Sequence, residues 1–331
     1  MRRLGRILLG LVAAIVVIGV VAFLALQRPD IPFATLDAKY ANSASRFMDM
    51  PGGLHVHYRD QGNPKGPVIV MVHGFAASLH TWEPWVARLG GDYRIVTLDL
   101  PGHGLTEAPA TYRTSMDRFA DVIDTLAQRL ELGPYVVVGN SMGGGAAWDL
   151  ALRHPDHLRG LVLVDSVGWP MRARNQGSPL IFKILAHPLG RALLRNLDTR
   201  PLAESGLKAA YVDKALVTPA LVDRYVELSR APGHRDILLN GQDRGASTIT
   251  AQTFQAIKLP TLVMHGAADT VIPLAAGQGL AGAIPGAKLI VYPGVGHVPM
   301  EQIPDRSAQD LRVFMQSLPS NASGAPVAAP G

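Results

Sequence analysis

The stretch GNSMGGG, residues 139–145, follows the apolar run PYVVV at 134–138 and places Ser141 where that run ends. A serine in a tight turn between a strand and a helix needs small neighbours, because the two elements pass close together there. Gly139 and Gly143 complete the pattern G-x-S-x-G, which exposes a nucleophile at the tip of a sheet. The stretch therefore predicts a strand, a strained turn at Ser141 and a following helix.

Short β-branched runs alternate with helical segments on both sides of this stretch. The alternation predicts an α/β fold, with a mostly parallel central sheet and flanking helices. The predicted strands are 54–60, 67–74, 93–100, 134–141, 159–166, 261–269 and 289–297, and the predicted helices are 81–88, 115–131, 142–153 and 304–318. The pattern breaks between Asp165 and Thr261, where apolar residues at helical spacing predict a helical insertion over about 168–258. This insertion, which we call the lid, is expected to cover the ligand crevice at the carboxyl ends of the strands.

The two ends of the chain differ in composition from its middle. Residues 7–26 carry no charged or strongly polar side chain, and a helix of that length spans about 30 Å, the thickness of a bilayer core. We expect a single-pass transmembrane signal anchor here; a cleaved signal peptide is the alternative, although its apolar part is usually about 7–15 residues long. Residues 27–47 are expected to be a linker, 48–318 the catalytic domain and 319–331 a disordered tail.

The basic residues near the first segment predict its orientation. Arg2, Arg3 and Arg6 precede the apolar run and Arg28 follows it, so residues 1–6 are expected in the cytoplasm and the domain on the periplasmic or extracellular side. These four arginines also account for most of the net charge of +5, because without them 27 basic residues face 26 acidic ones. Nucleic acid is therefore not an expected partner.

Several kinds of chemistry lack the residues that they need. The chain has no cysteine, which excludes disulfides, thiolate metal sites and cysteine nucleophiles. It also lacks H-E-x-x-H and a G-x-G-x-x-G run after an early strand, so neither a metal nor a dinucleotide cofactor is expected.

A serine hydroxyl needs a base, and the base needs a third group to orient it. His297 follows the last predicted strand and Asp269 the strand before it, giving the chain order serine, acid, histidine that is expected of this architecture. We predict Ser141, Asp269 and His297 as the catalytic residues, with Asp165 as the alternative acid. Asp99, in DLPGHGLT, is expected to brace the PGHG turn instead.

The loop after the strand at 67–74 is expected to complete an oxyanion hole. Its backbone N–H at Phe75 and that of Met142, the residue after the nucleophile, are the predicted donors, with His73 and Gly74 in support.

Three apolar residues, Trp82, Val271 and Val298, are predicted to line the substrate pocket. Within the lid, residues 171–200 hold six basic side chains against Asp198 alone, and a solvated face is favoured over one that lies on lipid.

Taken together, these motifs resemble those of the α/β-hydrolase superfamily over about residues 47–318. The resemblance is carried by VMVHGF (71–76), DLPGHGLT (99–106), VVVGNSMGGG (136–145), GAADTVIP (266–273) and GVGHVPME (294–301). It implies a serine branch of the family, because relatives with an aspartate nucleophile differ at Ser141. The motif GNSMGG is similar to that of C–C bond hydrolases of ring-fission products. Those enzymes usually carry a tryptophan where this chain has Val298.

We therefore expect a membrane-anchored serine hydrolase that cleaves a small-molecule carboxylic ester with an apolar portion and needs no cofactor. The alternatives are a C–C hydrolase of vinylogous diketones and a hydrolase-fold receptor or scaffold without enzymatic activity.

Overall fold

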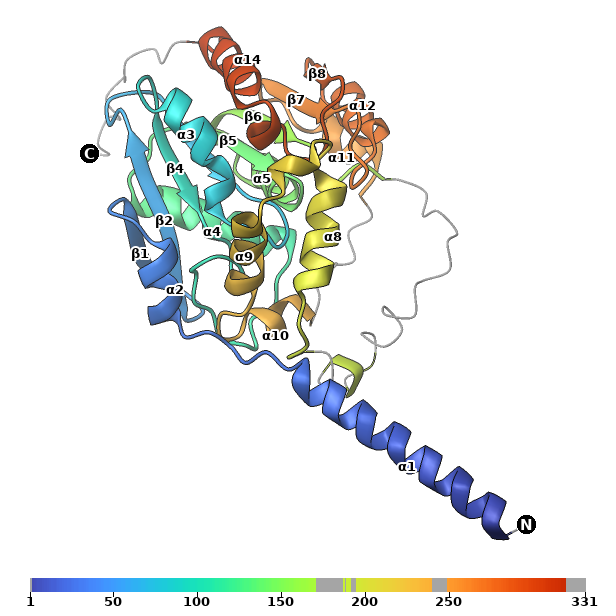
Figure 1. The fold of residues 1–331 in the computed structure, drawn as a ribbon. Helices are drawn as coiled ribbons and strands as arrows, with labels where there is room; N and C mark the ends of the chain where they lie inside the picture. The colour runs from blue at the N-terminus through green and yellow to red at the C-terminus, as the bar shows by residue number, and fades with distance from the viewer. Residues whose placement is uncertain (1, 171–186, 188, 192–194, 240–248, 320–331) are drawn as a thin grey trace.

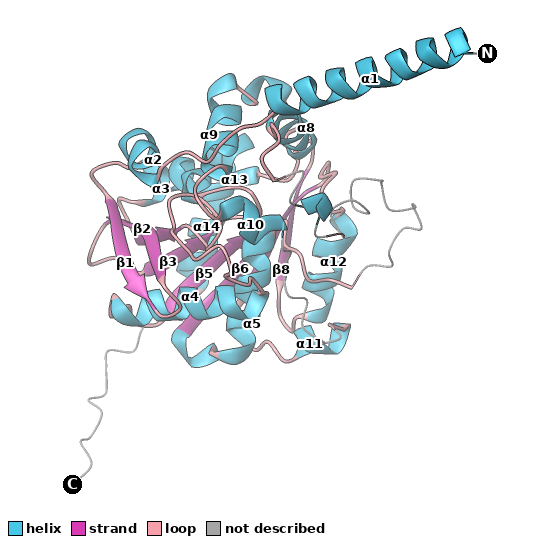
Figure 2. Ribbon diagram, turned by 90° about the horizontal axis from the view of Figure 1, so that it is seen from below, coloured by secondary structure: helices cyan, strands magenta, loops and turns pink. Residues whose placement is uncertain are grey.

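An eight-stranded sheet forms the centre of the molecule, with helices on both of its faces (Figures 1 and 2). The computed structural model describes residues 2–170, 187, 189–191, 195–239 and 249–319. The strands are β1 (Ser45–Met50), β2 (Leu54–Gly62), β3 (Val68–Val72), β4 (Arg94–Leu98), β5 (Tyr135–Asn140), β6 (Leu158–Val164), β7 (Thr261–Gly266) and β8 (Lys288–Tyr292). They lie in the order β1-β2-β4-β3-β5-β6-β7-β8, and only the pairs β1–β2 and β2–β4 are antiparallel. The predicted mostly parallel sheet is confirmed.

Helices cover both faces because side chains of the central strands alternate between two apolar cores. On β5, Val137 belongs to one core and its neighbours Val136 and Val138 to the other. The first face carries α4 (Met116–Arg129), α5 (Met142–Arg153), α11 (Ala251–Gln255) and α12 (Leu274–Ala283). The second carries η1 (Leu79–Trp82), α3 (Glu83–Leu89), α13 (Pro299–Gln302) and α14 (Pro304–Ser317). Strands buried on both sides explain the continuous apolar runs in the sequence.

The described part of the insertion between β6 and β7 is helical, as predicted for the lid. Its helices are α8 (Arg200–Ala210), η3 (Lys214–Leu216), α9 (Pro219–Ser229), α10 (His234–Leu239) and α11, while η2 (Pro155–His157) precedes β6. Thr218 caps α9 by accepting from the N–H of Leu221 at 3.2 Å, with Pro219 at the first helical position. Residues 171–186 and 240–248 of the lid, including much of its basic segment, lie outside the described residues.

Helix α1 (Arg2–Ala25) extends away from the rest of the molecule (Figure 1). Most of its described apolar side chains are exposed, and both Ile15 and Ile18 show 67% of their surface. Within the part of the chain that is described, none of the helices has the length and apolarity required to cross a membrane. The predicted transmembrane helix is therefore not confirmed.

The segment predicted as a linker packs against the domain, which corrects that prediction. It contains α2 (Phe33–Tyr40), whose Leu36 is buried in a small core with residues of the lid, and it runs into β1. The N–H of Arg28 donates to the carbonyl of Asn196 at 2.6 Å, and that of Asp198 donates to the carbonyl of Leu26 at 2.9 Å. The end of α1 is thus joined to the residues just before α8.

Candidate active site

Ser141 lies between β5 and α5 in a strained backbone conformation. Its φ of +54° and ψ of −116° fall where a residue other than glycine rarely lies, at a cost of about 1–3 kcal/mol. Added Cβ atoms would lie 2.2 Å from the carbonyl oxygen of Gly143 if placed on Gly139, and 2.3 Å from that of Val72 if placed on Gly143. The two glycines therefore allow the close approach of strand and helix that the sequence pattern predicts.

Asp269 and His297 meet at the same edge of the sheet, in the loops that follow β7 and β8. The Nδ1–H of His297 donates to Asp269 Oδ2 at 2.7 Å, and Asp269 Oδ1 accepts from the N–H groups of Val271 and Ile272 at 2.7 and 3.0 Å. Burial alone would raise the pKa of Asp269, but the hydrogen bond from His297 and its charge outweigh burial, so the pKa is lowered. A carboxylate that holds Nδ1–H leaves Nε2 of the imidazole as a proton acceptor.

Asn140 joins the turn of Ser141 to the loop of His297. Its Nδ2 donates to the carbonyl oxygens of His297 and Val164, each at 3.1 Å, and its side chain is buried. Among the described residues, the hydroxyl of Ser141 forms no hydrogen bond with His297. A missing bond of this kind is common in ligand-free sites, because the contacts tighten when substrate binds. No role for Asn140 was predicted from the sequence, where its only signal is an amide in a variable position of the G-x-S-x-G motif.

The loop after β3 passes directly beside the nucleophile. An added Cβ on Gly74 would lie 3.1 Å from the Cβ of Ser141, so the backbone of Gly74 and Phe75 borders the site. Met142 is the first residue of α5, where an N–H has no partner within its own helix. Both predicted oxyanion donors thus lie on backbone segments next to Ser141.

His73 fixes the shape of that loop. Its Nδ1–H donates to the carbonyl of Gly74 at 2.7 Å, and its Nε2 accepts from the N–H of Leu100 at 3.0 Å. Burial lowers the pKa of His73, which keeps it neutral and able to do both.

The three residues predicted to line a substrate pocket lie in different environments. Trp82 is fully buried in the core with its ring 5.3 Å from that of Trp85, and Val298 is buried in the same core. Only Val271 is exposed. Core packing, the alternative role of a large aromatic side chain, thus describes the surroundings of Trp82, and a role in a substrate pocket stays a prediction. A cavity of 410 Å³ elsewhere in the described structure is lined by none of the predicted site residues.

The carboxyl end of α8 contacts both loops of the candidate site, those after β7 and β8. The carbonyl of Ala210 accepts from the N–H of His297, and that of Ala209 accepts from the hydroxyl of Thr270, each at 2.8 Å. Tyr211 adds a hydrogen bond from its hydroxyl to Glu301 at 2.7 Å. Main-chain contacts of this kind leave no signature in the sequence.

The other two aspartates at strand ends do not contact His297. Asp165 is fully buried and its Oδ1 accepts from the N–H of Gly266 at 2.8 Å. Asp99 accepts from His57 Nδ1–H at 2.7 Å and from the N–H of Leu105 at 2.9 Å. Asp99 therefore braces the PGHG turn, as predicted.

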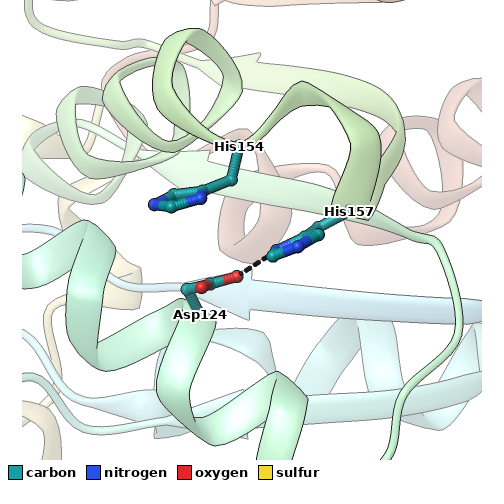
Figure 3. Close-up of side chains that lie close together, drawn as sticks. All are labelled: Asp124, His154 and His157. Atoms are coloured by element: carbon teal, nitrogen blue, oxygen red, sulfur yellow. Dashed lines mark hydrogen bonds and ion pairs between the residues drawn. The ribbon is translucent and has the colours of Figure 1, made fainter.

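Asp124, His154 and His157 form a cluster at the opposite end of α5 from Ser141 (Figure 3). His157 Nδ1–H donates to Asp124 at 2.6 Å, and the two imidazoles lie nearly parallel, at 13°, with centroids 5.3 Å apart. Because the lone pairs lie in the ring planes, those of parallel rings do not converge on one point. The cluster ties α4 to the connection between α5 and β6.

Comparison with known proteins places this site among hydrolases. The family model described as alpha/beta hydrolase fold matches residues 67–303. The chain is 30% identical over 258 residues to a pimeloyl-[acyl-carrier protein] methyl ester esterase of Nitrosomonas europaea, covering 76% of this chain and 96% of that protein. It is 29% identical to a 2-hydroxymuconate semialdehyde hydrolase of Pseudomonas sp. strain CF600, covering 74% and 84%. A solved structure described as a bacterial membrane phospholipase A superposes with a TM-score of 0.70 at 25% identity, covering 94% of this chain and 98% of that one.

Proposed function

The chain belongs to the α/β-hydrolase family and is a hydrolase, and on this premise we propose that it cleaves carboxylic esters with a sizeable apolar portion through Ser141. The proposal rests on one observation: the strained turn at Ser141 lies at the same edge of the sheet as Asp269 and His297, which are joined by a hydrogen bond. A strained, glycine-flanked serine costs stability, and such strain is typical of functional sites. The esterase among the relatives supports the choice of an ester.

In the proposed reaction, Nε2 of His297 takes the proton of Ser141 as the hydroxyl oxygen attacks the ester carbonyl. The N–H groups of Phe75 and Met142 hold the oxyanion, where one donor typically contributes about 3 kcal/mol to transition-state stabilisation. The imidazolium gives its proton to the departing alcohol. Water, deprotonated by His297, then attacks the acyl-enzyme, and Ser141 recovers its proton as the acid leaves. Asp269 keeps Nδ1 protonated throughout.

The test is a series of p-nitrophenyl esters of increasing acyl length, assayed with the full chain in detergent. We expect a chain-length optimum and loss of activity in Ser141→Ala. The matched serine control is Ser317→Ala at the end of α14, whose neighbour Leu318 lies against Gly160 near the start of β6. An inactive but folded wild-type protein, or an unimpaired Ser141→Ala variant, would contradict the proposal.

A second candidate is cleavage of a C–C bond in a vinylogous diketone. The 2-hydroxymuconate semialdehyde hydrolase among the relatives favours it, while Val298, buried beside the base, departs from the tryptophan usual in that group. A ring-fission product turned over with a higher kcat/KM than any ester would make this the main activity.

We also propose that α1 attaches the domain to a membrane. The exposed apolar side chains of α1 support this, as does the likeness over 94% of the chain to a protein described as a membrane phospholipase A. Full-length protein should float with phosphatidylcholine vesicles in high salt, and a chain that begins at Arg28 should not. Equal flotation of the two would contradict the proposal. The orientation expected from the arginines stays a prediction.

A further inference from the structure

A second buried carboxyl group lies behind the acid of the site. One oxygen of Asp165, one of Asp269 and a ring nitrogen of His265 lie within 4.8 Å of one another, and none of the three residues is exposed by more than 8%. Asp165 follows β6 directly, and its φ of +45° is a second strained backbone conformation at this edge. The proposed function gives this residue no role.

The two oxygens of Asp165 differ in their partners. Oδ1 accepts from the N–H of Gly266, whereas Oδ2 is buried and forms no hydrogen bond with the described residues around it. A buried carboxylate oxygen without a donor is costly, since the ionised form can only accept. With a proton on Oδ2, the same group becomes a donor.

Among the described groups around Asp165, the carboxylate of Asp269 is the acceptor for that proton. His265 Nδ1 also lacks a partner among them, but it lies against Gly277, and Nε2 is the nitrogen near Asp165, at 3.6 Å. His265 donates through Nε2 to the carbonyl of Ile272 at 3.0 Å, and burial lowers its pKa, so it brings no positive charge. Tyr292 donates its hydroxyl to Asp310 at 2.8 Å. Asp269 must stay ionised to hold His297, and two adjacent buried carboxyl groups cannot both be charged without a large penalty.

We propose that Asp165 is protonated and donates from Oδ2 to the carboxylate of Asp269, as a positioning residue that extends the triad by one member. Asp269 can accept this bond, because its oxygens have four lone-pair sites and three are filled by Val271, Ile272 and His297. Burial and the nearby charge of Asp269 raise the pKa of Asp165 well above its ordinary value, which agrees with a protonated Asp165. The proposal rests on the proposed function for its kinetic consequence only.

The bond to Asp269 sets the basicity of His297. A donor on Asp269 withdraws charge from it, so the imidazolium of His297 is stabilised less than by a free carboxylate. Removing the donor should therefore move the acid limb of the pH profile of kcat/KM to higher pH.

The experiment compares Asp165→Asn with Asp165→Leu in the full chain. Asparagine keeps both bonds, accepting from Gly266 and donating to Asp269, so the acid limb should stay where it is in the wild type. Leucine, branched at Cγ like aspartate, keeps the shape without the β-branching that a φ of +45° disfavours, and it removes the donor, so the limb should move to higher pH by about 0.5–1 unit. A limb that moves to lower pH by about one unit in Asp165→Asn would show that a negative charge was lost, and would overturn the proposal. Loss of all activity in Asp165→Asn, with Asp269→Asn active, would make Asp165 the acid of the triad and overturn it as well.

A second measurement does not depend on activity. The infrared difference spectrum of wild type minus Asp165→Asn at neutral pH should contain the C=O stretch of a protonated carboxylic acid. A carboxylate band in its place would overturn the proposal even if no ester is turned over. In contrast, an inactive wild-type protein that shows the acid band would count against the proposed function alone.

Discussion

Replacing Asn140 by alanine tests whether the turn of the nucleophile and the loop of the base are held together by one side chain. The substitution removes two buried hydrogen bonds, one to Val164 and one to His297. The carbonyl of Val164 keeps a partner, because it also accepts from the N–H of Ser141 at 3.0 Å. The carbonyl of His297 is left without its donor, which costs about 1–3 kcal/mol in a buried place.

We expect the free energy of unfolding to fall by about 2–3 kcal/mol, with about 1 kcal/mol from the bond to Val164 and the rest from His297. For a domain of this size, Tm should fall by roughly 4–10 °C. The kcat/KM for an ester, measured well below Tm, should fall by about tenfold or more, because the base loses one of its anchors.

The matched control is Asn63→Ala, which removes one hydrogen bond, from the N–H of Lys65, in an exposed turn. Its stability should change by less than about 0.5 kcal/mol and its kcat/KM should be that of the wild type. Circular dichroism establishes that both variants are folded. An Asn140→Ala variant with wild-type Tm and kcat/KM would refute the reasoning, since the buried amide would then be dispensable.

Three further predictions concern the turn, the lid and acid stability. Gly143→Ala should destabilise the fold by about 1–3 kcal/mol in urea titrations, because its Cβ would lie 2.3 Å from a main-chain oxygen at the end of β3. Gly133→Ala, whose Cβ meets nothing within 4 Å, should change stability little, and equal effects would contradict the argument. Tyr211→Phe should cost about 1 kcal/mol by removing a hydrogen bond of the lid, whereas Tyr135→Phe, which removes a buried hydroxyl without a partner among the described residues, should be neutral or stabilising. Burial lowers the pKa of His80 from 6.5 to about 4, so below pH 6.5 the unfolded chain binds a proton that the folded one refuses. Between pH 6.5 and about 4 this one group should lower the free energy of unfolding by about 1.4 kcal/mol per pH unit, and His80→Gln should make the measured slope shallower by that amount; an unchanged slope would argue against the assignment.

The fold could be predicted where side chains repeat a local pattern. The buried strand before Ser141, the glycines around it and the order of Asp269 and His297 are all legible in sequence, because strand ends and turns select particular residues. Strand β1 and helix α2 were missed, since short elements in a proline-broken segment depend on tertiary packing of residues such as Leu36.

That Ser141, Asp269 and His297 lie at one edge of the sheet could be predicted from the sequence, whereas the residues that surround them could be predicted less well. Trp82 was predicted to line the pocket and is buried in the core, and the sequence could not distinguish the two, because a large aromatic side chain satisfies either pattern. The contacts that place His297 come from Asn140 and from the main chain of Ala210, and a carbonyl oxygen at a helix end is independent of the residue that bears it. The nearness of Asp165 to Asp269 follows from the pairing of β6 with β7, which only the folded sheet reveals.

Helix α8 is fastened at both of its ends, to Leu26 and Arg28 through the residues before it, and to His297 through Ala210. An eleven-residue helix is a stiff rod about 16 Å long, so a displacement at one end is carried to the other. The imidazole is thereby mechanically linked to the point where α1 leaves the domain. A truncation made at Arg28 for ease of purification would remove the contact of Leu26 near one end of α8. Kinetic constants from such a protein would then describe a site that is held less rigidly than in the full-length chain.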